Sequence, residues 1–296
     1  MSASPFKGTG VALVTPFKSD KTIDFPALEK LVDFVIEGGV DYLVALGTTA
    51  ETPTISASEK LDVLFNIIER CNKRVPVVCG IGGNNTSETI KQFEIYPMDK
   101  IDGILSVSPY YNKPSQQGII EHYKEIDRHC PVPIILYNVP GRTASNMLAS
   151  TTLQIVHECE HVVAIKEASG NMAQCMELAK NKPKHFTLIS GDDNLAMAQI
   201  ACGFEGVISV AANAFPKLFC ELIASSLKHA FTHAQKLQYR LLDGLDLLFA
   251  EGNPAGVKCV LHEMNLCENE LRLPMLPVSY ATQESIREFL KTLNNK

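Results

Sequence analysis

The sequence predicts a (β/α)8 TIM barrel followed by a C-terminal helical extension. Short apolar stretches, rich in β-branched residues, alternate along the chain with segments that have helical apolar spacing. These stretches are nearly continuous in their apolar character, as expected for parallel strands that are covered on both faces. There are eight such strand–helix units, the number that closes a barrel. A doubly wound open sheet is the structural alternative.

The expected elements follow one another with short connections. After residue 214 no further strand is indicated, and helical segments broken at Gly252-Asn253-Pro254 and at 274–277 complete the chain. We therefore expect a catalytic barrel over residues 1–225 and a helical extension over 226–296. Plausible helix caps include Ser58 and Asn171. The expected strands are 10–15, 41–46, 75–80, 103–108, 133–138, 162–167, 186–190 and 205–210, and helical segments include 26–37, 58–71, 86–94, 118–129 and 171–181.

Composition excludes several classes of function. The net charge of -6, without a basic stripe, argues against nucleic-acid binding. No apolar run approaches the length of a membrane span, and the N-terminal MSASPFKGTG has no apolar signal core. The nine cysteines are odd in number and form no CxxC pair, which indicates reduced thiols. We expect a cytoplasmic protein that acts on small molecules.

Lys166 is the first candidate for chemistry. It lies near the carboxyl end of the stretch 162–167, and active sites of barrels lie at the carboxyl ends of the strands. Strand alternation predicts that Lys166 shares a face with Val162, Ala164 and Ala168. A water-poor setting favours the neutral amine, which is a nucleophile toward carbonyl groups. The alternative is a strand-edge lysine that extends to solvent.

Four other strand ends carry polar groups, and each has a structural alternative as a turn, a core residue or a surface residue. Hydroxyls with backbone N–H groups can hold a carboxylate, a phenol can relay protons, and an arginine can bind a carboxylate through two hydrogen bonds. We interpret Asp192-Asp193-Asn194 as the cap of the next helix. The segments are Gly47-Thr48-Thr49-Ala50-Glu51-Thr52, Ser108-Pro109-Tyr110-Tyr111-Asn112, Tyr137-Asn138-Val139-Pro140-Gly141-Arg142-Thr143 and Ser190-Gly191-Asp192-Asp193-Asn194.

These strand ends, together with that of Lys166, contain no histidine or cysteine, which favours carbonyl chemistry through an imine over metal or thiol chemistry. A competing motif is His157-Glu158-Cys159-Glu160-His161, which matches the zinc-binding pattern H-E-x-x-H. That pattern requires both histidines on one helix. Because His161 directly precedes the strand beginning at Val162, we expect the helix to have ended, on the side of the barrel away from the active site. No metal is expected.

The motifs together resemble the dihydrodipicolinate synthase family, pyruvate-dependent class I aldolases that include N-acetylneuraminate lyase. The likeness runs in register from about residue 6 to Leu276. It is carried by Gly47-Thr48-Thr49-Ala50-Glu51, Ser108-Pro109-Tyr110-Tyr111-Asn112-Lys113-Pro114-Ser115-Gln116, Leu136-Tyr137-Asn138-Val139-Pro140-Gly141-Arg142-Thr143, Ile165-Lys166-Glu167, Ser190-Gly191-Asp192-Asp193, Gly206-Val207-Ile208-Ser209-Val210 and Arg272-Leu273-Pro274.

The resemblance implies a lyase in which Lys166 forms a Schiff base with pyruvate. Tyr137, Thr48 and Tyr111 would form a proton relay, with Tyr111 supplied by the neighbouring subunit of a tight dimer. A homotetramer, built as a dimer of dimers, is implied as well. No organic cofactor or metal is needed.

The resemblance also implies the groups that bind substrate. Thr49 and nearby backbone would hold the pyruvate carboxylate, and Arg142 would receive the carboxylate of L-aspartate 4-semialdehyde. Gly191 and Ile208 would contribute backbone contacts near the lysine. Ala50 is a departure, because the family usually has glycine there, and it could alter the turn.

Two features bear on the substrate. Many sialic acid and sugar-acid lyases have serine before threonine where this chain has Thr48-Thr49, and they lack an arginine at the position of Arg142. Both favour condensation of pyruvate with L-aspartate 4-semialdehyde to 4-hydroxy-tetrahydrodipicolinate, in the diaminopimelate route of lysine biosynthesis. The alternatives are a retro-aldol lyase acting on a 2-keto-3-deoxy sugar acid or sialic acid, and a non-catalytic ligand-binding barrel.

Inhibition by L-lysine stays open. The family's inhibitor site lies at the dimer interface, and the matching positions Asn84, Glu88 and Tyr110 could bind the charged groups of an amino acid. Ala57 and Lys60, however, stand where sensitive bacterial enzymes often carry histidines. Lys60 would repel a cationic ligand.

Overall fold

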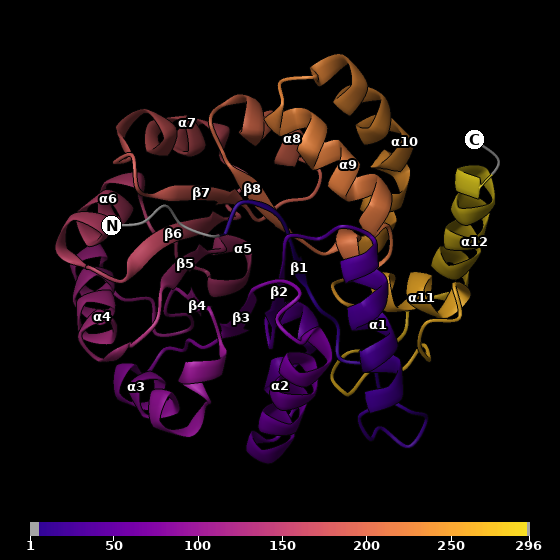
Figure 1. The fold of residues 1–296 in the computed structure, drawn as a ribbon, viewed down its shortest axis with the longest axis horizontal. Coiled ribbons are helices and arrows are strands. Elements are labelled where there is room, and N and C mark those ends of the chain that lie inside the picture. Colours follow the sequence, from indigo (N-terminus) through magenta and orange to yellow (C-terminus); the bar gives the residue numbers. More distant parts are fainter. Residues whose placement is uncertain (1–5, 295–296) are drawn as a thin grey trace.

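The computed structural model describes residues 6–294. The outer limits of the two expected domains, at residues 1 and 296, lie outside the described residues, as do residues 1–5 of the segment expected to lack a signal core. The strands are all parallel and close a barrel in the order β1 to β8, which confirms the predicted fold class (Figure 1). They are β1 (Gly8–Ala12), β2 (Tyr42–Ala45), β3 (Val77–Gly80), β4 (Gly103–Val107), β5 (Ile134–Asn138), β6 (Val162–Glu167), β7 (Thr187–Ser190) and β8 (Gly206–Ser209).

Helices surround the strands, and the last three lie to one side, beyond α1 and α9 (Figure 1). Short 3-10 turns follow β2 and β8, at the carboxyl rim of the barrel. The helices are α1 (Phe25–Glu37), α2 (Ala57–Cys71), α3 (Thr86–Ile95), α4 (Gln116–His129), α5 (Pro140–Thr143), α6 (Ala149–Glu158), α7 (Met172–Asn181), α8 (Ala196–Ala201), α9 (Pro216–Leu227), α10 (Phe231–Phe249), α11 (Ala255–Glu263) and α12 (Tyr280–Asn294). The proposed domain boundary at residue 225 falls in the last turn of α9.

Side-chain caps determine where several helices begin. The Asn171 side chain accepts hydrogen bonds from the N–H groups of Ala173 and Gln174, so this predicted cap is confirmed. The predicted cap Ser58 is wrong. Ser56 caps α2 instead, because its hydroxyl accepts from Glu59 N–H while the Glu59 carboxylate accepts from Ser56 N–H.

Apolar residues form two layers, one inside the barrel and one between the strands and the helices. Ala164 belongs to the inner layer, as predicted for the face of Lys166. Val162, however, packs in the outer layer, so its predicted position is wrong. The pairing of β5 with β6 shifts register there: Ile134 pairs with Val162, whereas Ile135 pairs with Ala164. A β-bulge of this kind inverts the facing of the residues before it.

Strand β1 ends earlier than the expected range 10–15. The N–H of Leu13 still donates to the carbonyl of Val44, but the N–H of Val14 donates to the Asn213 side chain. The same side chain donates to the carbonyl of Ala12. Asn213 thus replaces the sheet hydrogen bonds of β1 with side-chain bonds at the rim.

The end of α6 settles the geometry of the H-E-x-x-H segment. Helix α6 ends at Glu158, and His161 lies just before β6, at the amino end of the barrel. The two histidines therefore do not share a helix, as expected. The His161 ring faces Asp127, whose carboxylate accepts the His161 N–H.

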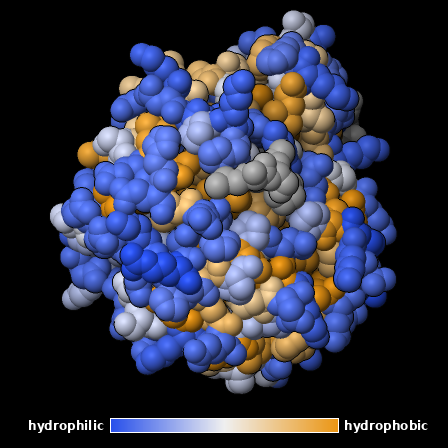
Figure 2. All heavy atoms as spheres, turned by 60° about the vertical axis from the view of Figure 1, so that its left-hand side comes forward, coloured by the Kyte–Doolittle hydropathy of each residue, from blue (hydrophilic) through white to orange (hydrophobic). Residues whose placement is uncertain are grey.

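The extension packs back on the barrel through α9. Helix α10 runs alongside α9, and α12 packs on α10 where Gly244 leaves room for the Phe289 ring. The face drawn in Figure 2 is mostly hydrophilic, with smaller hydrophobic patches between the polar groups. Within residues 6–294, no helix is long and apolar enough to span a membrane.

Candidate active site

A cavity of ≈ 360 Å³ opens at the carboxyl rim of the barrel. Six residues predicted from the sequence line it, although they come from four different strand ends. The extension contributes Phe249 and Asn253 to the same wall. The structure therefore brings together Thr48, Thr49, Tyr137, Arg142, Lys166 and Gly191.

Lys166 lies on the inner face of β6 and is 6% exposed, so the alternative of a solvent-exposed strand-edge lysine does not hold. It pairs in register with Tyr137 of β5, and its Nζ is 4.5 Å from the centre of the Tyr137 ring. The next residue, Glu167, points away from the cavity, where its carboxylate accepts hydrogen bonds from Asn138 and Gln174. The Lys166 amine is thus the reactive group that β6 presents to the cavity.

Gly191 makes room for Lys166 at the end of β7. A Cβ atom at this position would lie 2.5 Å from the Ala168 Cβ and 3.1 Å from the Lys166 Cε. The Gly191 N–H donates to the carbonyl of Glu167, which holds the two strand ends together. Any larger residue at position 191 would displace the lysine side chain.

Thr48 and Thr49 lie in a 3-10 turn, Thr48–Ala50, that follows β2. The Thr52 hydroxyl closes the turn by donating to the carbonyls of Leu46 and Gly47. Ala50 is buried within the turn, and the left-handed conformation falls on the next residue, Glu51, with φ 56°. The alanine in place of glycine therefore does not occupy the position where positive φ is required.

Arg142 lies in the short helix α5, directly after β5. Its side chain is exposed and borders the cavity. Among residues 6–294, no carboxylate pairs with its guanidinium group. A free guanidinium at the mouth of a cavity is suited to bind the carboxylate of a ligand.

Two predicted site residues do not line the cavity. Ile208 is buried in the inner apolar layer beneath it, while Val210, two residues further, reaches the wall. Tyr111 is 88% exposed, with φ 69°, and is not among the residues that line the cavity. No part of residues 6–294 covers the Tyr111 ring.

A second pocket of ≈ 480 Å³ adjoins the cavity and shares Thr48, Tyr137 and Arg142 with it. Tyr110 and Lys60 line this second pocket. Asn84 donates to the carbonyl of Tyr110. Glu88, in the first turn of α3, forms an exposed ion pair with Lys91. Of the three expected inhibitor-site residues, Asn84 and Tyr110 therefore lie on the neighbouring loops β3–α3 and β4–α4, and Glu88 lies at the start of α3.

The interpretation of Asp192-Asp193-Asn194 as a helix cap is wrong, because α8 begins only at Ala196 and has no side-chain cap. Asp193 instead accepts from the N–H groups of Val210 and Ala211, and Asn194 donates to Asp246. Asp192 lines the cavity, and its Oδ2 atom is buried without a hydrogen-bond partner. Burial, with a smaller contribution from Asp193, raises the pKa of Asp192 to about 6.

Asn253, a residue not predicted to belong to the site, lies in the connection between α10 and α11. Its side-chain NH2 donates to the Thr49 hydroxyl at 3.0 Å. The Thr49 hydroxyl hydrogen is consequently free to donate to a ligand. The only signal in the sequence was the break at Gly252-Asn253-Pro254, which marks a loop but not its contact. Within the described residues, no group of three or more His, Cys, Asp or Glu side chains is placed to hold a metal.

Comparison with known proteins agrees with this geometry. The model of the dihydrodipicolinate synthetase family matches residues 5–293. The chain belongs to this family. It is 48% identical over 290 residues to a 4-hydroxy-tetrahydrodipicolinate synthase of Parabacteroides distasonis, covering 98% of each chain. It is 49% identical over 284 residues to the enzyme of the same name from Azobacteroides pseudotrichonymphae, covering 96% of each chain.

Solved structures of the family share the whole fold. Dihydrodipicolinate synthase from Aquifex aeolicus superposes with a TM-score of 0.94 at 39% identity, covering 98% of each chain. The chloride-inhibited synthase from Acinetobacter baumannii, complexed with pyruvate, has a TM-score of 0.94 at 38% identity, covering 97% of this chain and 99% of that one. The synthase from Cyanidioschyzon merolae, with lysine bound, has a TM-score of 0.92 at 32% identity, covering 98% and 99%.

The raised pKa of Asp192 predicts a pH-dependent stability. Its folded pKa of about 6 exceeds the ordinary aspartate value of 3.8, so ionisation of this carboxyl opposes folding. The penalty is absent below about pH 4, grows toward pH 6 and is complete above it. Asp192→Asn should therefore become more stable than the wild type as pH rises, by about 2–3 kcal/mol over this window. Urea unfolding from about pH 4 to about pH 7 measures this difference.

Glu59→Gln should show the opposite dependence of folding stability on pH. Arg272 lowers the pKa of Glu59 to about 2, so the ionised carboxylate stabilises the fold above the unfolded value of 4.5. This variant should lose stability at neutral pH and approach the wild type as pH falls toward 2. If Asp192→Asn and the wild type keep a constant difference over the whole range, Asp192 does not carry a raised pKa.

Proposed function

We propose that this protein condenses pyruvate with L-aspartate 4-semialdehyde through a Schiff base on Lys166, giving 4-hydroxy-tetrahydrodipicolinate for lysine biosynthesis. The observation that carries the proposal is the cavity itself. It brings one buried amine together with the hydroxyls of a turn and a guanidinium that is unpaired within residues 6–294. The names of the full-length relatives support the same activity.

The chemistry begins with attack of the Lys166 amine on the keto carbon of pyruvate. Water leaves, and the resulting imine withdraws electrons from the methyl group, which loses a proton to form an enamine. The enamine carbon then attacks the aldehyde carbon of the second substrate. Finally, the amino group of that substrate attacks the imine carbon, closes the ring and expels the Lys166 amine. Overall, one water molecule is released for each product molecule formed.

Proton transfers would run through Tyr137 and Thr48. The Tyr137 ring lies against the Lys166 Nζ, and Thr48 lines both adjoining pockets. A hydroxyl that can both donate and accept is suited to carry protons between imine, enamine and solvent. Thr49, held by Asn253, would bind the pyruvate carboxylate with nearby backbone N–H groups, and the backbone at Gly191 and Ile208 would complete the pyruvate site.

Arg142 is the residue that favours the synthase over a sugar-acid lyase. Its guanidinium is unpaired within residues 6–294 and borders the cavity. The second substrate brings a carboxylate, whereas a retro-aldol lyase must accommodate a chain of hydroxyl groups. The full-length relatives named as synthases favour the same choice.

Tyr111 supports an oligomeric site. Its ring is exposed, its backbone has a positive φ, and the preceding residue, Tyr110, lines the second pocket. Tyrosine is enriched at interfaces between chains, where its ring is covered and its hydroxyl finds a partner. We place Tyr111 in the active site of a neighbouring subunit, within a homotetramer arranged as a dimer of dimers. We also propose a cytoplasmic location, which the free thiols of all nine cysteines support.

We further propose L-lysine as a weak ligand of the interface formed by Asn84, Glu88 and Tyr110. The carboxylate of Glu88 and the amide of Asn84 are suited to an amino acid's charged groups. Lys60 lines the same pocket as Tyr110, and its ammonium opposes a cationic side chain. The proposal is therefore weak inhibition, not tight feedback control.

Reduction with borohydride tests the imine. Pyruvate plus borohydride should leave a stable pyruvyl adduct on Lys166, seen by peptide mass spectrometry, because reduction traps the C=N bond. Arg142→Ala should trap pyruvate like the wild type but should raise the KM for L-aspartate 4-semialdehyde about 10–100-fold, the loss expected for a charged hydrogen bond. Lys166→Ala is the control without an adduct. Equal loss of trapping and of turnover in Arg142→Ala would place the arginine elsewhere.

Mixed oligomers test whether Tyr111 acts between subunits. Lys166→Ala and Tyr111→Phe should each have little activity alone. In a mixed dimer, one site combines an intact Lys166 with the partner's intact Tyr111, so co-expression should restore about a quarter of wild-type activity. Separately purified and unmixed variants provide the baseline. An inactive mixture would show that Tyr111 acts within its own chain.

Substitution of Lys60 tests the proposed inhibitor site. Lys60→Ala should lower the L-lysine concentration for half-inhibition about two- to fivefold, because interactions of exposed charges are worth up to roughly 1 kcal/mol. Lys73→Ala, an exposed lysine beyond the end of α2, should leave it unchanged. Initial rates at saturating substrate, titrated with L-lysine, give both values. If the wild type and both variants are all insensitive to L-lysine, the proposed inhibitor site is wrong.

A further inference from the structure

Glu51 directly follows the turn that carries Thr48 and Thr49, yet its side chain leaves the cavity. The residue is 4% exposed and holds a left-handed conformation, with φ 56° and ψ 34°. Both carboxylate oxygens contact the C-terminal extension. Oε1 accepts from the Nζ of Lys258 at 2.5 Å, and Oε2 accepts from the backbone N–H of Arg272 at 3.0 Å.

Lys258 lies on α11 and is fully buried. Its Nζ also donates to the carbonyl of Glu270 at 2.8 Å and lies 4.1 Å from the centre of the Phe17 ring. Burial lowers the pKa of Lys258, and the adjacent Glu51 carboxylate opposes that effect. A buried ammonium of this kind is held by its partners and has no route to solvent.

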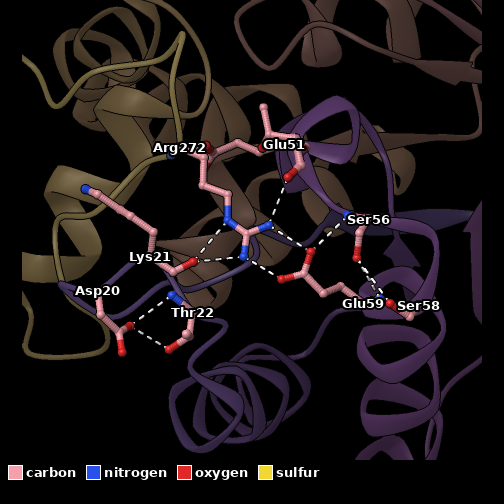
Figure 3. Close-up of polar contacts among 9 residues, drawn as sticks. Asp20, Lys21, Thr22, Glu51, Ser56, Ser58, Glu59 and Arg272 are labelled. Carbon is pink, nitrogen blue, oxygen red and sulfur yellow. Dashed lines mark hydrogen bonds and ion pairs between the residues drawn. The ribbon is translucent and has the colours of Figure 1, made fainter.

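Arg272 ties the extension to the segment after the turn (Figure 3). Its guanidinium donates twice to the carbonyl of Lys21, at 2.8 and 3.0 Å, and once to the carbonyl of Thr54, at 2.9 Å. Two further hydrogen bonds, at 2.5 and 3.0 Å, reach both carboxylate oxygens of Glu59. All five N–H groups of the side chain are therefore used.

The C-terminal extension thus makes several hydrogen bonds to the threonine turn and to the residues that follow it. Asn253 reaches the Thr49 hydroxyl, Lys258 and Arg272 hold Glu51, and Arg272 holds Thr54. A left-handed residue without glycine is strained and persists only where its surroundings fix it. The strained residue, Glu51, directly follows the turn that carries the threonine hydroxyls, and its side chain is bound by Lys258 and Arg272.

We infer that the buried ion pair of Glu51 and Lys258, supported by Arg272, positions the Thr48–Thr49 turn for pyruvate. The helical extension is then a working part of the pyruvate site, not only a cover for the barrel. Lys258 and Glu51 are positioning residues, because neither lines the cavity. The inference rests on the proposed function, since it assigns the two threonines to pyruvate.

Lys258→Met removes the charge while keeping side-chain length. The KM for pyruvate should rise about tenfold, the effect of losing one hydrogen bond to a charged group. The KM for L-aspartate 4-semialdehyde should stay within about twofold, because α5 holds Arg142 independently of the extension. The variant should still form the borohydride-trapped adduct at saturating pyruvate. Its melting temperature should fall, because the Glu51 carboxylate is left buried and unpaired.

Lys182→Met is the matched control. Lys182 is also largely buried, and it donates to the Glu205 carboxylate and to a backbone carbonyl, that of Phe186. This pair lies at the amino end of β7 and β8, away from the cavity. The control should lower the melting temperature without changing either KM. A rise of the pyruvate KM in both variants would mean that general destabilisation, not positioning, affects the site, and would overturn the inference.

The double variant Glu51→Gln/Lys258→Met separates the positioning role of the ion pair from its role in stability. It also replaces Lys258→Met as the test if that variant does not fold. It leaves no unpaired buried charge, so its melting temperature should recover toward the wild type. Its pyruvate KM should stay raised. Recovery of both values would overturn the inference and leave the ion pair a purely structural role. If the wild type itself forms no pyruvyl adduct on Lys166, the proposed function fails, whatever these variants show.

Discussion

The alternation of side chains along β6 is the constraint on which the site depends. In a closed parallel barrel every second residue points inward, and the interior holds only as many side chains as fit. Ala164, Ile189 and Ile208 belong to the apolar layer that fills this interior, and Tyr137 packs beside Lys166. The lysine is therefore the next inward residue above an apolar floor. Its amine can neither withdraw into the barrel nor pass between the strands.

Because side chains alternate regularly along strands, much of the barrel could be predicted from the sequence. The places where the alternation breaks could not. The eight strands, the barrel and the position of Lys166 follow from apolar runs and their spacing. The bulge before Ala164 does not, because an extra residue in an apolar run leaves the run looking the same. Ser58 and Asp192 were misassigned for a related reason. Several polar residues near a helix start are all compatible with a cap, and only the coordinates show which one makes the hydrogen bond.

Contacts between distant segments were the least predictable part of the site. Asn253 is 204 residues from Thr49, and Lys258 is 207 residues from Glu51. Patterns within one segment carry no information about such pairs. A division into a catalytic barrel and an extension follows the change in secondary structure at residue 214, but hydrogen bonds to the threonine turn cross that division. Leaving one member of such a buried pair alone costs about 3–5 kcal/mol, so the turn and the extension constrain each other.

The charges around the cavity also explain how two carboxylate substrates can be kept apart. The Thr48–Thr49 turn offers hydroxyls and backbone N–H groups, which bind a carboxylate without a full positive charge. The ammonium of Lys258 lies behind the turn but is neutralised by Glu51. Within the described chain, Arg142 is the unpaired guanidinium that remains at the rim. In the proposed mechanism, a pyruvate carboxylate held by neutral donors would leave that guanidinium free for the second carboxylate, and the aldehyde of the second substrate would then face the enamine on Lys166.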